Sequence, residues 1–266
     1  MLRKFLQNTA ETKRIYSSPV TASGSGSTLI NDTKFNQTIS SVAEIYRLIP
    51  DVDQGEGFDE RTGNQIEPKR LTVQLALSLV TPSSAVTATG LGGNAISYPE
   101  NITVHIFFLK SRQVADVANY TAIPITELMS EGGGQNAQQF DGSFWNAQLG
   151  VNSNLFSVIK HLKINMKKGN GWSSYVSYAE QSGSSVPPQL PCDGQADFNR
   201  VHRINVNIPM PKKLTYDSDF TKQPSNYFPF MVAGYTCNEY PVTTAWANTW
   251  YPLAISARTL FTYTDI

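Results

Sequence analysis

The stretch LTVQLALSLV, residues 71–80, decides the fold class of this chain. Apolar residues occupy every second position, and polar or small residues occupy most positions between them. The apolar positions are Leu71, Val73, Leu75, Leu77 and Leu79. Successive side chains of a β-strand point to opposite faces of its sheet. The alternation therefore predicts a half-buried strand of the antiparallel kind.

The same alternation recurs along the chain. It appears in NITVHIFFLK (101–110), FSVIKHLKINMKK (156–168), VHRINVNIPM (201–210), YFPFMVAGY (227–235) and LAISARTLFTY (253–263), and less regularly in SVAEIYRLI (41–49). In the second of these we expect Phe156, Val158, Leu162, Ile164 and Met166 on one face, interrupted by Lys160. In the fourth we expect Phe228, Phe230 and Val232 together. Helical periodicity is nearly absent. Strands without helices between them predict an all-β antiparallel sandwich or barrel.

Residues 39–266 are expected to form one domain with four long connections, residues 82–100, 111–154, 169–199 and 211–225. Loops longer than about 12–15 residues are uncommon and usually functional. Residues 1–38 are expected to be a flexible, mildly basic amino-terminal arm and linker. SSPVTASGSGST (17–28) has the composition of a linker, and the residues before it carry four basic side chains against Glu11.

Composition excludes several function classes. Lysine plus arginine equals aspartate plus glutamate at 21 each, so the chain has no net charge to attract an anionic partner over distance. The start lacks the apolar stretch of a signal peptide, and no run is long and apolar enough for a membrane span. Without a signal peptide, Cys192 and Cys237 are expected to be free thiols.

No enzyme chemistry assembles from these residues. The three histidines, His105, His161 and His202, fall on the polar phase of strand patterns, where they are expected at the surface or between strands. With two cysteines besides, no zinc spacing is present, and no serine sits in G-x-S-x-G. We predict that the chain has no catalytic residues and binds no cofactor and no metal.

The polar stretch DVDQGEGFDERTGNQIEPKR, residues 51–70, needs separate consideration as a calcium loop. An EF-hand requires glycine at its sixth position and glutamate at its twelfth, where this chain has Glu56 and Thr62. A looser calcium site built from Asp51, Asp53, Asp59 and Glu60 remains an alternative to a solvated acidic turn. The glycines at 55, 57 and 63 are expected to supply positive φ and a close chain reversal.

Basic residues collect at the ends of the expected strands. They are Lys69 and Arg70, Lys110 and Arg112, Lys160, Lys163, Lys167 and Lys168, Arg200 and Arg203, and Lys212 and Lys213. They serve either solubility and edge protection or a surface that meets phosphates. The four tryptophans stand in or beside loops, which favours contacts between protein subunits. They are Trp145, Trp172, Trp246 and Trp250.

The segment QGEGFDERTGNQIEPKRLTVQLAL, residues 54–77, resembles the early part of capsid proteins from small circular single-stranded DNA viruses, the circovirus-like group. The matching positions are Gly55, Gly57, Arg61, Gly63, Asn64, Ile66, Lys69 and Arg70. FSVIKHLKINMKK (156–168) resembles the middle strand of that family, and ISARTLFTYTDI (255–266) resembles its last strand. In order and spacing the similarity covers residues 39–266.

The resemblance implies a single eight-stranded jelly roll with long loops, a β-sandwich whose copies close into a small icosahedral shell. A T=1 shell of about sixty copies would enclose a circular single-stranded DNA genome, and the chain would be found in the virion and, during assembly, inside the host cell. Residues 51–70 would then connect two strands. The nucleic-acid-binding candidates are Arg3, Lys4, Lys13, Arg14, Lys69, Arg70, Lys167 and Lys168. The four tryptophans are the candidates for inter-subunit contact, and the host receptor is not identified.

Two other readings stay open. The arm carries only four basic residues, which neutralise few phosphates and bind them weakly. A coat protein of a small single-stranded RNA virus uses the same fold, and fold alone does not fix function. A carbohydrate-binding β-sandwich would also use aromatic loops. A sugar-binding module should stay monomeric or form small oligomers, whereas a coat protein should assemble into shells.

Overall fold

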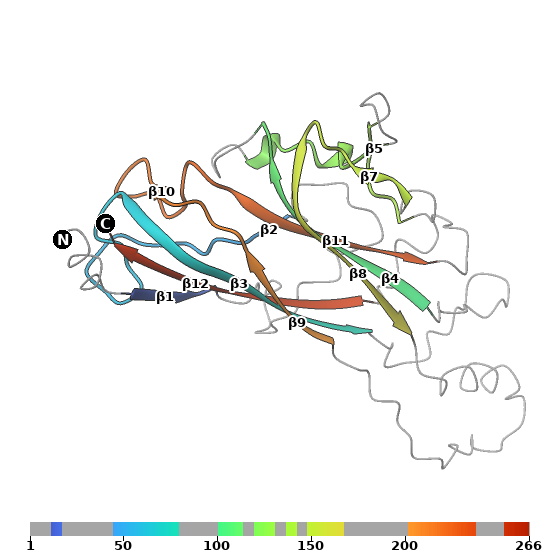
Figure 1. Cartoon of the computed structure of the whole chain (residues 1–266), viewed down its shortest axis with the longest axis horizontal. Helices are drawn as coiled ribbons and strands as arrows, with labels where there is room; N and C mark the ends of the chain where they lie inside the picture. The colour runs from blue at the N-terminus through green and yellow to red at the C-terminus, as the bar shows by residue number, and fades with distance from the viewer. Residues whose placement is uncertain are drawn as a thin grey trace, which may run out of the picture.

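The computed structural model describes residues 12–17, 45–79, 101–113, 120–130, 137–142, 148–167, 202–237 and 253–265. This part of the chain consists mainly of antiparallel strands (Figure 1). Its helical structure is limited to two 3-10 turns, η3 (Tyr120–Ala122) and η4 (Ile125–Glu127). None of the described helices is long and apolar enough to cross a membrane. The predicted all-β class is confirmed.

The first sheet is centred on two long strands, β3 (Gln65–Leu79) and β12 (Leu253–Asp265), which pair along most of their length. β1 (Thr12–Tyr16) adds to the free edge of β12. β9 (His202–Ile208) and the short β10 (Leu214–Thr215) both pair with the other edge of β3.

The second sheet has the order β2-β11-β4-β8. Its strands are β2 (Tyr46–Arg47), β11 (Pro229–Cys237), β4 (Asn101–Ser111) and β8 (Phe156–Lys167). A small third sheet joins β5 (Met129–Ser130) to β6 (Ala137–Gln138) and β7 (Gly150–Val151). Across the two large sheets, the pairings are nested: β1 with β12, β2 with β11, β3 with β9, and β4 with β8.

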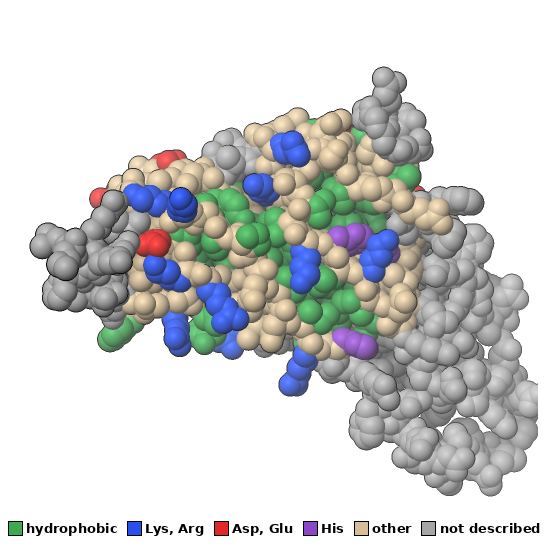
Figure 2. Space-filling model, viewed as in Figure 1, with side chains coloured by type: hydrophobic (Ala, Val, Ile, Leu, Met, Phe, Trp, Pro, Cys, Tyr) green, Lys and Arg blue, Asp and Glu red, His purple; other side chains and the backbone are tan. Residues whose placement is uncertain are grey.

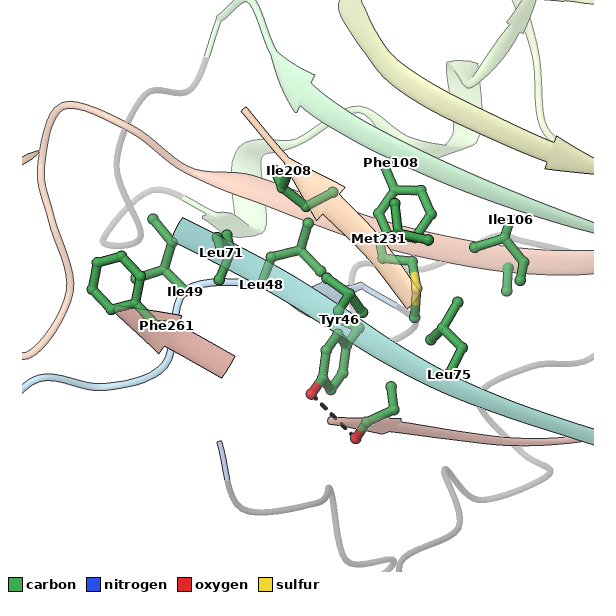
Figure 3. Packing of buried hydrophobic residues seen from close by; sticks show 14 of the residues in the cluster. Tyr46, Leu48, Ile49, Leu71, Leu75, Ile106, Phe108, Ile208, Met231 and Phe261 are labelled. Atoms are coloured by element: carbon green, nitrogen blue, oxygen red, sulfur yellow. Dashed lines mark hydrogen bonds between the residues drawn. The ribbon is translucent and has the colours of Figure 1, made fainter. Parts of the chain in front are cut away.

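The main hydrophobic core lies between the two large sheets. Leu71, Val73, Leu75 and Leu77 of β3 point into it, as the alternation predicted, and each is at most 3% exposed. Ile106 and Phe108 of β4 approach from the other side (Figure 3). Burial of each such side chain contributes about 1.5–3 kcal/mol. The hydroxyl of Tyr46 lies 3.4 Å from the carbonyl oxygen of Ala257, so this aromatic side chain also keeps a hydrogen bond inside the core (Figure 3).

Two central strands of the second sheet, β4 and β11, are buried on both faces, which their sequence patterns did not indicate. Phe228, Phe230 and Val232 share a face as expected, but they pack in a second cluster on the far side of the sheet. The alternate residues Met231 and Ala233 line the main core. Residues of η4 and β5 cover this far side, including Ile125 and Met129. When both faces of a strand are covered, apolar residues do not alternate with polar ones, so the sequence does not show which face points to the main core.

A β-bulge corrects the expected face of β8. The register shifts so that Phe108 pairs with Lys160 and Leu109 with Val158, which leaves Ile159 as an extra residue. One inserted residue reverses which alternate side chains face which side. Phe156 therefore packs in the second cluster, whereas Leu162, Ile164 and Met166 pack against the main core.

Part of the segment expected to be an arm belongs to the first sheet. β1 pairs residue by residue with β12, and Ile15, only 8% exposed, lies in the main core. The five residues of this strand alternate too briefly to stand out in the sequence, and a partner strand about 250 positions away stabilises them. Of the expected strand at residues 41–49, the described portion contains only β2.

Candidate nucleic-acid interface

The outer face of the first sheet carries a group of cations, here called the basic face. It consists of Arg14, Lys69, Arg70, Arg203 and Arg258, all exposed. The four arginines belong to β1, β3, β9 and β12 and alternate with core residues, so the alternation that buries one face of each strand exposes the guanidinium groups on the other.

Strand register sets the spacing of the basic face. Thr262 lies between Arg14 and Arg70 in one row across the sheet. Gln74 lies between Arg258 and Asn205 four residues along. Adjacent strands are about 4.8 Å apart, so the cations are distributed over the face and separated by uncharged hydrogen-bonding groups.

A bulge in β3 brings two successive cations to this surface. Thr262 pairs with Arg70 and Tyr263 with Pro68, so Lys69 is the extra residue. In a regular strand Lys69 and Arg70 would point to opposite sides. The bulge places both in solvent within β3 rather than at its end, where the sequence predicted them.

Side-chain contacts orient two of the arginines. Arg70 donates from Nε to Thr72 Oγ1 at 2.9 Å and from Nη2 to Asn207 Oδ1 at 3.3 Å. Arg258 stacks over the ring of Tyr16, with 4.2 Å between the guanidinium carbon and the ring centroid. Tyr16 is 50% exposed, so the ring is available to a further partner. A flat cation beside an exposed aromatic ring is a surface on which a nucleic-acid base can stack.

Acidic groups are nearly excluded from the basic face. Among the outward-facing residues described in β1, β3, β9 and β12, the single carboxylate is Glu67, and it pairs with Lys69 at 2.8 Å. Because the whole chain is neutral, this face must be balanced by acidic residues elsewhere. The uneven distribution creates a local positive field that the net charge hides.

The structure separates the candidates chosen from sequence. Arg14, Lys69 and Arg70 lie together on the basic face. Lys13 points the other way and is only 5% exposed. Its Nζ pairs with Asp265 Oδ2 at 2.9 Å and donates to the carbonyl oxygen of Glu60 at 2.6 Å. Lys13 therefore fastens β1 inside the molecule.

Several candidates lie outside the described residues. These are Arg3, Lys4, Lys168, the side chain of Lys167, and the four tryptophans Trp145, Trp172, Trp246 and Trp250. Arg203 and Arg258 were not among the nucleic-acid-binding residues predicted from the sequence. The signal for Arg258 was present, since Ile255, Ala257 and Phe261 are core positions and Arg258 falls on the opposite phase.

The acidic loop at residues 51–64 is organised around one arginine. Arg61 is fully buried and donates to the carbonyl oxygens of Gly63, Ser218 and Thr221 at 2.6, 2.9 and 2.9 Å, and to Asn64 Oδ1 at 3.0 Å. Its guanidinium carbon also lies 4.3 Å from the centroid of the Tyr216 ring. These contacts join the loop to residues 216–222.

Three of the five carboxylates of this loop have partners within the chain. Asp53 pairs with Lys222 at 2.8 Å, and Asp51 lies 3.9 Å from Arg47. Glu60 Oε2 accepts from the backbone N–H of Gly57 at 2.8 Å. Within the described ranges no three histidine, cysteine, aspartate or glutamate side chains converge as metal ligands would.

The loop glycines have a different role from the expected one. In the part of the chain that is described, the one glycine with positive φ is Gly142. A Cβ at Gly55 would lie 2.0 Å from Glu60 Oε2, and one at Gly57 would lie 3.0 Å from the same atom. These two glycines therefore allow the Glu60 carboxylate to reach the backbone, while Gly63 has open space.

Two of the histidines lie between neighbouring strands, the second of the two expected locations, and one of them is buried. His105 is 2% exposed, and its Nδ1 lies 3.3 Å from His161 Nε2. His161 stacks on Phe107 at 4.2 Å between ring centroids. Burial, then repulsion from His161 and Lys163, lowers the pKa of His105 to about 4. Burial and Lys163 lower the pKa of His161 to about 4 as well, so both rings are neutral at pH 7.

Neither the models of protein families nor the curated proteins include a match to this chain.

Proposed function

We propose that this chain is a structural capsid protein whose copies form a small closed shell around circular single-stranded DNA. The basic face binds the genome through its phosphates. The chain has no catalytic role in this proposal, and its partners are further copies of itself and the nucleic acid. The finer fold that belongs to this proposal is an eight-stranded jelly roll with about sixty copies in the shell.

The nested strand pairing supports the jelly-roll assignment. Eight of the strands, taken in chain order, are β1, β2, β3, β4, β8, β9, β11 and β12. The first pairs with the eighth, the second with the seventh, the third with the sixth and the fourth with the fifth. A strip of four antiparallel pairs rolled into two packed sheets gives this pattern. β5, β6, β7 and β10, of two residues each, are additions to it.

The observation that carries the functional proposal is the difference between the two outer faces of the sandwich. The first sheet presents the basic face directly to solvent, while much of the outer face of the second sheet, though not Lys163 and Asn165 of β8, is covered by a layer drawn from the connection between β4 and β8. A shell subunit needs one face for the enclosed nucleic acid and another for the outside. The exposed basic sheet is suited to the first and the covered sheet to the second.

The basic face favours binding of nucleic acid that does not depend on the nucleotide sequence. Arginine meets phosphate with paired N–H donors, and Tyr16 with Arg258 offers a stacking surface to any base. The basic face has five cations, and the negative charge of Glu67 cancels one of them. About four phosphate contacts per subunit remain. For single strands this predicts a slope of log affinity against log salt of about −3. Each contact is weak, but many linked copies bind one genome together.

The test combines electron microscopy of purified particles with the ratio of absorbance at 260 and 280 nm. Shells rich in nucleic acid are expected from the native chain, and DNase rather than RNase should degrade the contents after disassembly. RNA in the particles would favour the coat of an RNA virus. A monomer at all salt concentrations and pH values would refute the proposal.

A matched pair of variants isolates the basic face. Arg203→Gln/Arg258→Gln removes two charges from it, whereas Lys212→Gln/Lys213→Gln removes two exposed charges outside it. We expect the first variant to form shells with less nucleic acid and a salt slope that is shallower by about 1.4. The second should resemble the native chain. Equal nucleic-acid content in both would refute the role of the basic face.

A further inference from the structure

Two phenylalanine side chains are unusually exposed. Phe58 is 85% exposed and Phe220 is 94% exposed, against 50% for Tyr16 and 46% for Val158, the other large apolar side chains exposed among the described residues. Burying a phenylalanine side chain is worth about 1.5–3 kcal/mol, and neither ring gains this within the chain. Exposed aromatic rings are typical of surfaces that bind another protein.

The loops that carry these rings are held firmly. Arg61 donates to the carbonyl oxygens of Ser218 and Thr221, which flank Phe220, and lies three residues after Phe58. The backbone N–H of Val52 also donates to the carbonyl oxygen of Lys222 at 2.8 Å. Because a fully buried guanidinium fixes both loops, little conformational entropy remains to be lost when the rings are covered.

The same two loops are strongly acidic. Residues 51–60 and 217–221, here called the acidic loop end, contain seven of the 21 acidic residues of the chain and no basic residue. The seven are Asp51, Asp53, Glu56, Asp59, Glu60, Asp217 and Asp219. Most of the acidic side chains visible in Figure 2 gather at the end of the molecule where β10 lies. A partner for this surface should therefore combine positive charge with an apolar recess.

The chain itself provides such a recess. A cleft of about 420 Å³ opens where β4 and β8 meet the residues leading into β11, and it is here called the basic cleft. Lys110 and Arg112 line it together with Tyr227 and Phe228, and its lining contains no carboxylate among the described residues. Lys110 Nζ lies 6.0 Å from the Tyr227 ring centroid. Cations beside aromatic side chains complement a phenylalanine flanked by carboxylates.

We propose that the acidic loop end of one copy docks into the basic cleft of a second copy. This rests on the proposed function, for which it names a contact between subunits. The contact joins two different surfaces and so is heterologous, and heterologous contacts close into rings when the rotation between successive copies closes. Each phenylalanine contributes about 150–250 Å² of surface. The two rings thus supply roughly half of the 800 Å² per partner typical of a stable interface.

The first test removes the apolar part. Phe58→Ser/Phe220→Ser is expected to remain folded, with an unchanged circular dichroism spectrum, and to sediment as a monomer where the native chain forms shells. Phe58→Leu/Phe220→Leu is the matched control, since it keeps an exposed apolar side chain at both positions, and it should still assemble. Shells from the double variant would overturn the inference without affecting the proposed function. Failure of the native chain to form shells would count against both.

The second test identifies the partner surface by charge reversal. Asp59→Lys/Asp217→Lys and Lys110→Glu/Arg112→Glu should each reduce shell yield at low salt at least tenfold. The variant that combines all four changes restores opposite charges at every contact and should recover assembly. If the combined variant stays monomeric and neither double variant assembles, the acidic loop end does not contact the basic cleft. If either double variant assembles normally, the contact is also refuted.

Discussion

Replacing Arg61 tests whether one buried guanidinium holds two distant loops together. Arg61→Met keeps most of the apolar volume of the side chain but removes all of its donors. Four acceptors would lose bonds of 3.0 Å or less: the carbonyl oxygens of Gly63, Ser218 and Thr221, and Asn64 Oδ1. Arg61→Lys keeps the charge, but a single ammonium group cannot reach acceptors on both loops in the fork geometry of a guanidinium.

The magnitude follows from three acceptors, the carbonyl oxygens of Gly63 and Thr221 and Asn64 Oδ1, because the Ser218 carbonyl oxygen still accepts from the hydroxyl and the backbone N–H of Thr221. Each buried acceptor without a partner costs about 1–3 kcal/mol, and relief of the desolvated charge offsets part of that. We expect Arg61→Met to lower the free energy of unfolding by about 3 kcal/mol and Tm by about 6–12 °C for a domain of this size. Arg61→Lys should cost a similar amount.

The assay is thermal unfolding followed by circular dichroism, together with hydrogen exchange of residues 51–64 and 216–222. Arg258→Met is the matched control because it removes an exposed arginine, and it should change the free energy of unfolding by less than about 1 kcal/mol. If Arg61→Met lowers Tm by less than about 2 °C and leaves exchange in both loops unchanged, the contacts of Arg61 do not hold the loops.

Two further predictions concern pH and the loop glycines. The pKa values of His105 and His161 are lowered to about 4 in the folded chain, so the unfolded chain binds more protons below pH 6.5. Stability should be fully present above pH 6.5 and fall toward pH 4, by up to about 1.4 kcal/mol per pH unit for each imidazole. Urea unfolding between pH 7 and pH 5 measures this, and a decline equally steep in His161→Gln would contradict it. Gly55→Ala should cost about 1 kcal/mol because its Cβ displaces the Glu60 carboxylate, whereas Gly63→Ala should be neutral, as chemical denaturation can show. Equal effects of the two substitutions would argue against the displacement.

The candidate interface was partly predictable. The exposure of Arg70 followed from the alternation of β3, because it alternates with Leu71, whereas the exposure of Lys69 beside it depends on the bulge. The exposure of Arg258 could also have been predicted from the sequence. Ala257 and Phe261 of the same strand occupy core positions, and Arg258 alternates with them. The burial of Lys13 could not be read locally, because its partner Asp265 comes from the other end of the chain. Nor could the sequence show that four strands bring these arginines to one face.

The sequence by itself determined the all-β class and the core face of β3. Period-two alternation reports whether one side of a strand is buried, which is a local property. Only the tertiary structure decided that β1 joins the first sheet, that a bulge at Ile159 reverses the faces of β8, and that His105 is buried. It also decided the partners of Arg61, whose bond to Ser218 spans 157 positions. These features depend on which distant segment covers a strand or pairs with it. Such contacts do not produce a periodic pattern in the local sequence, so they cannot be predicted from it.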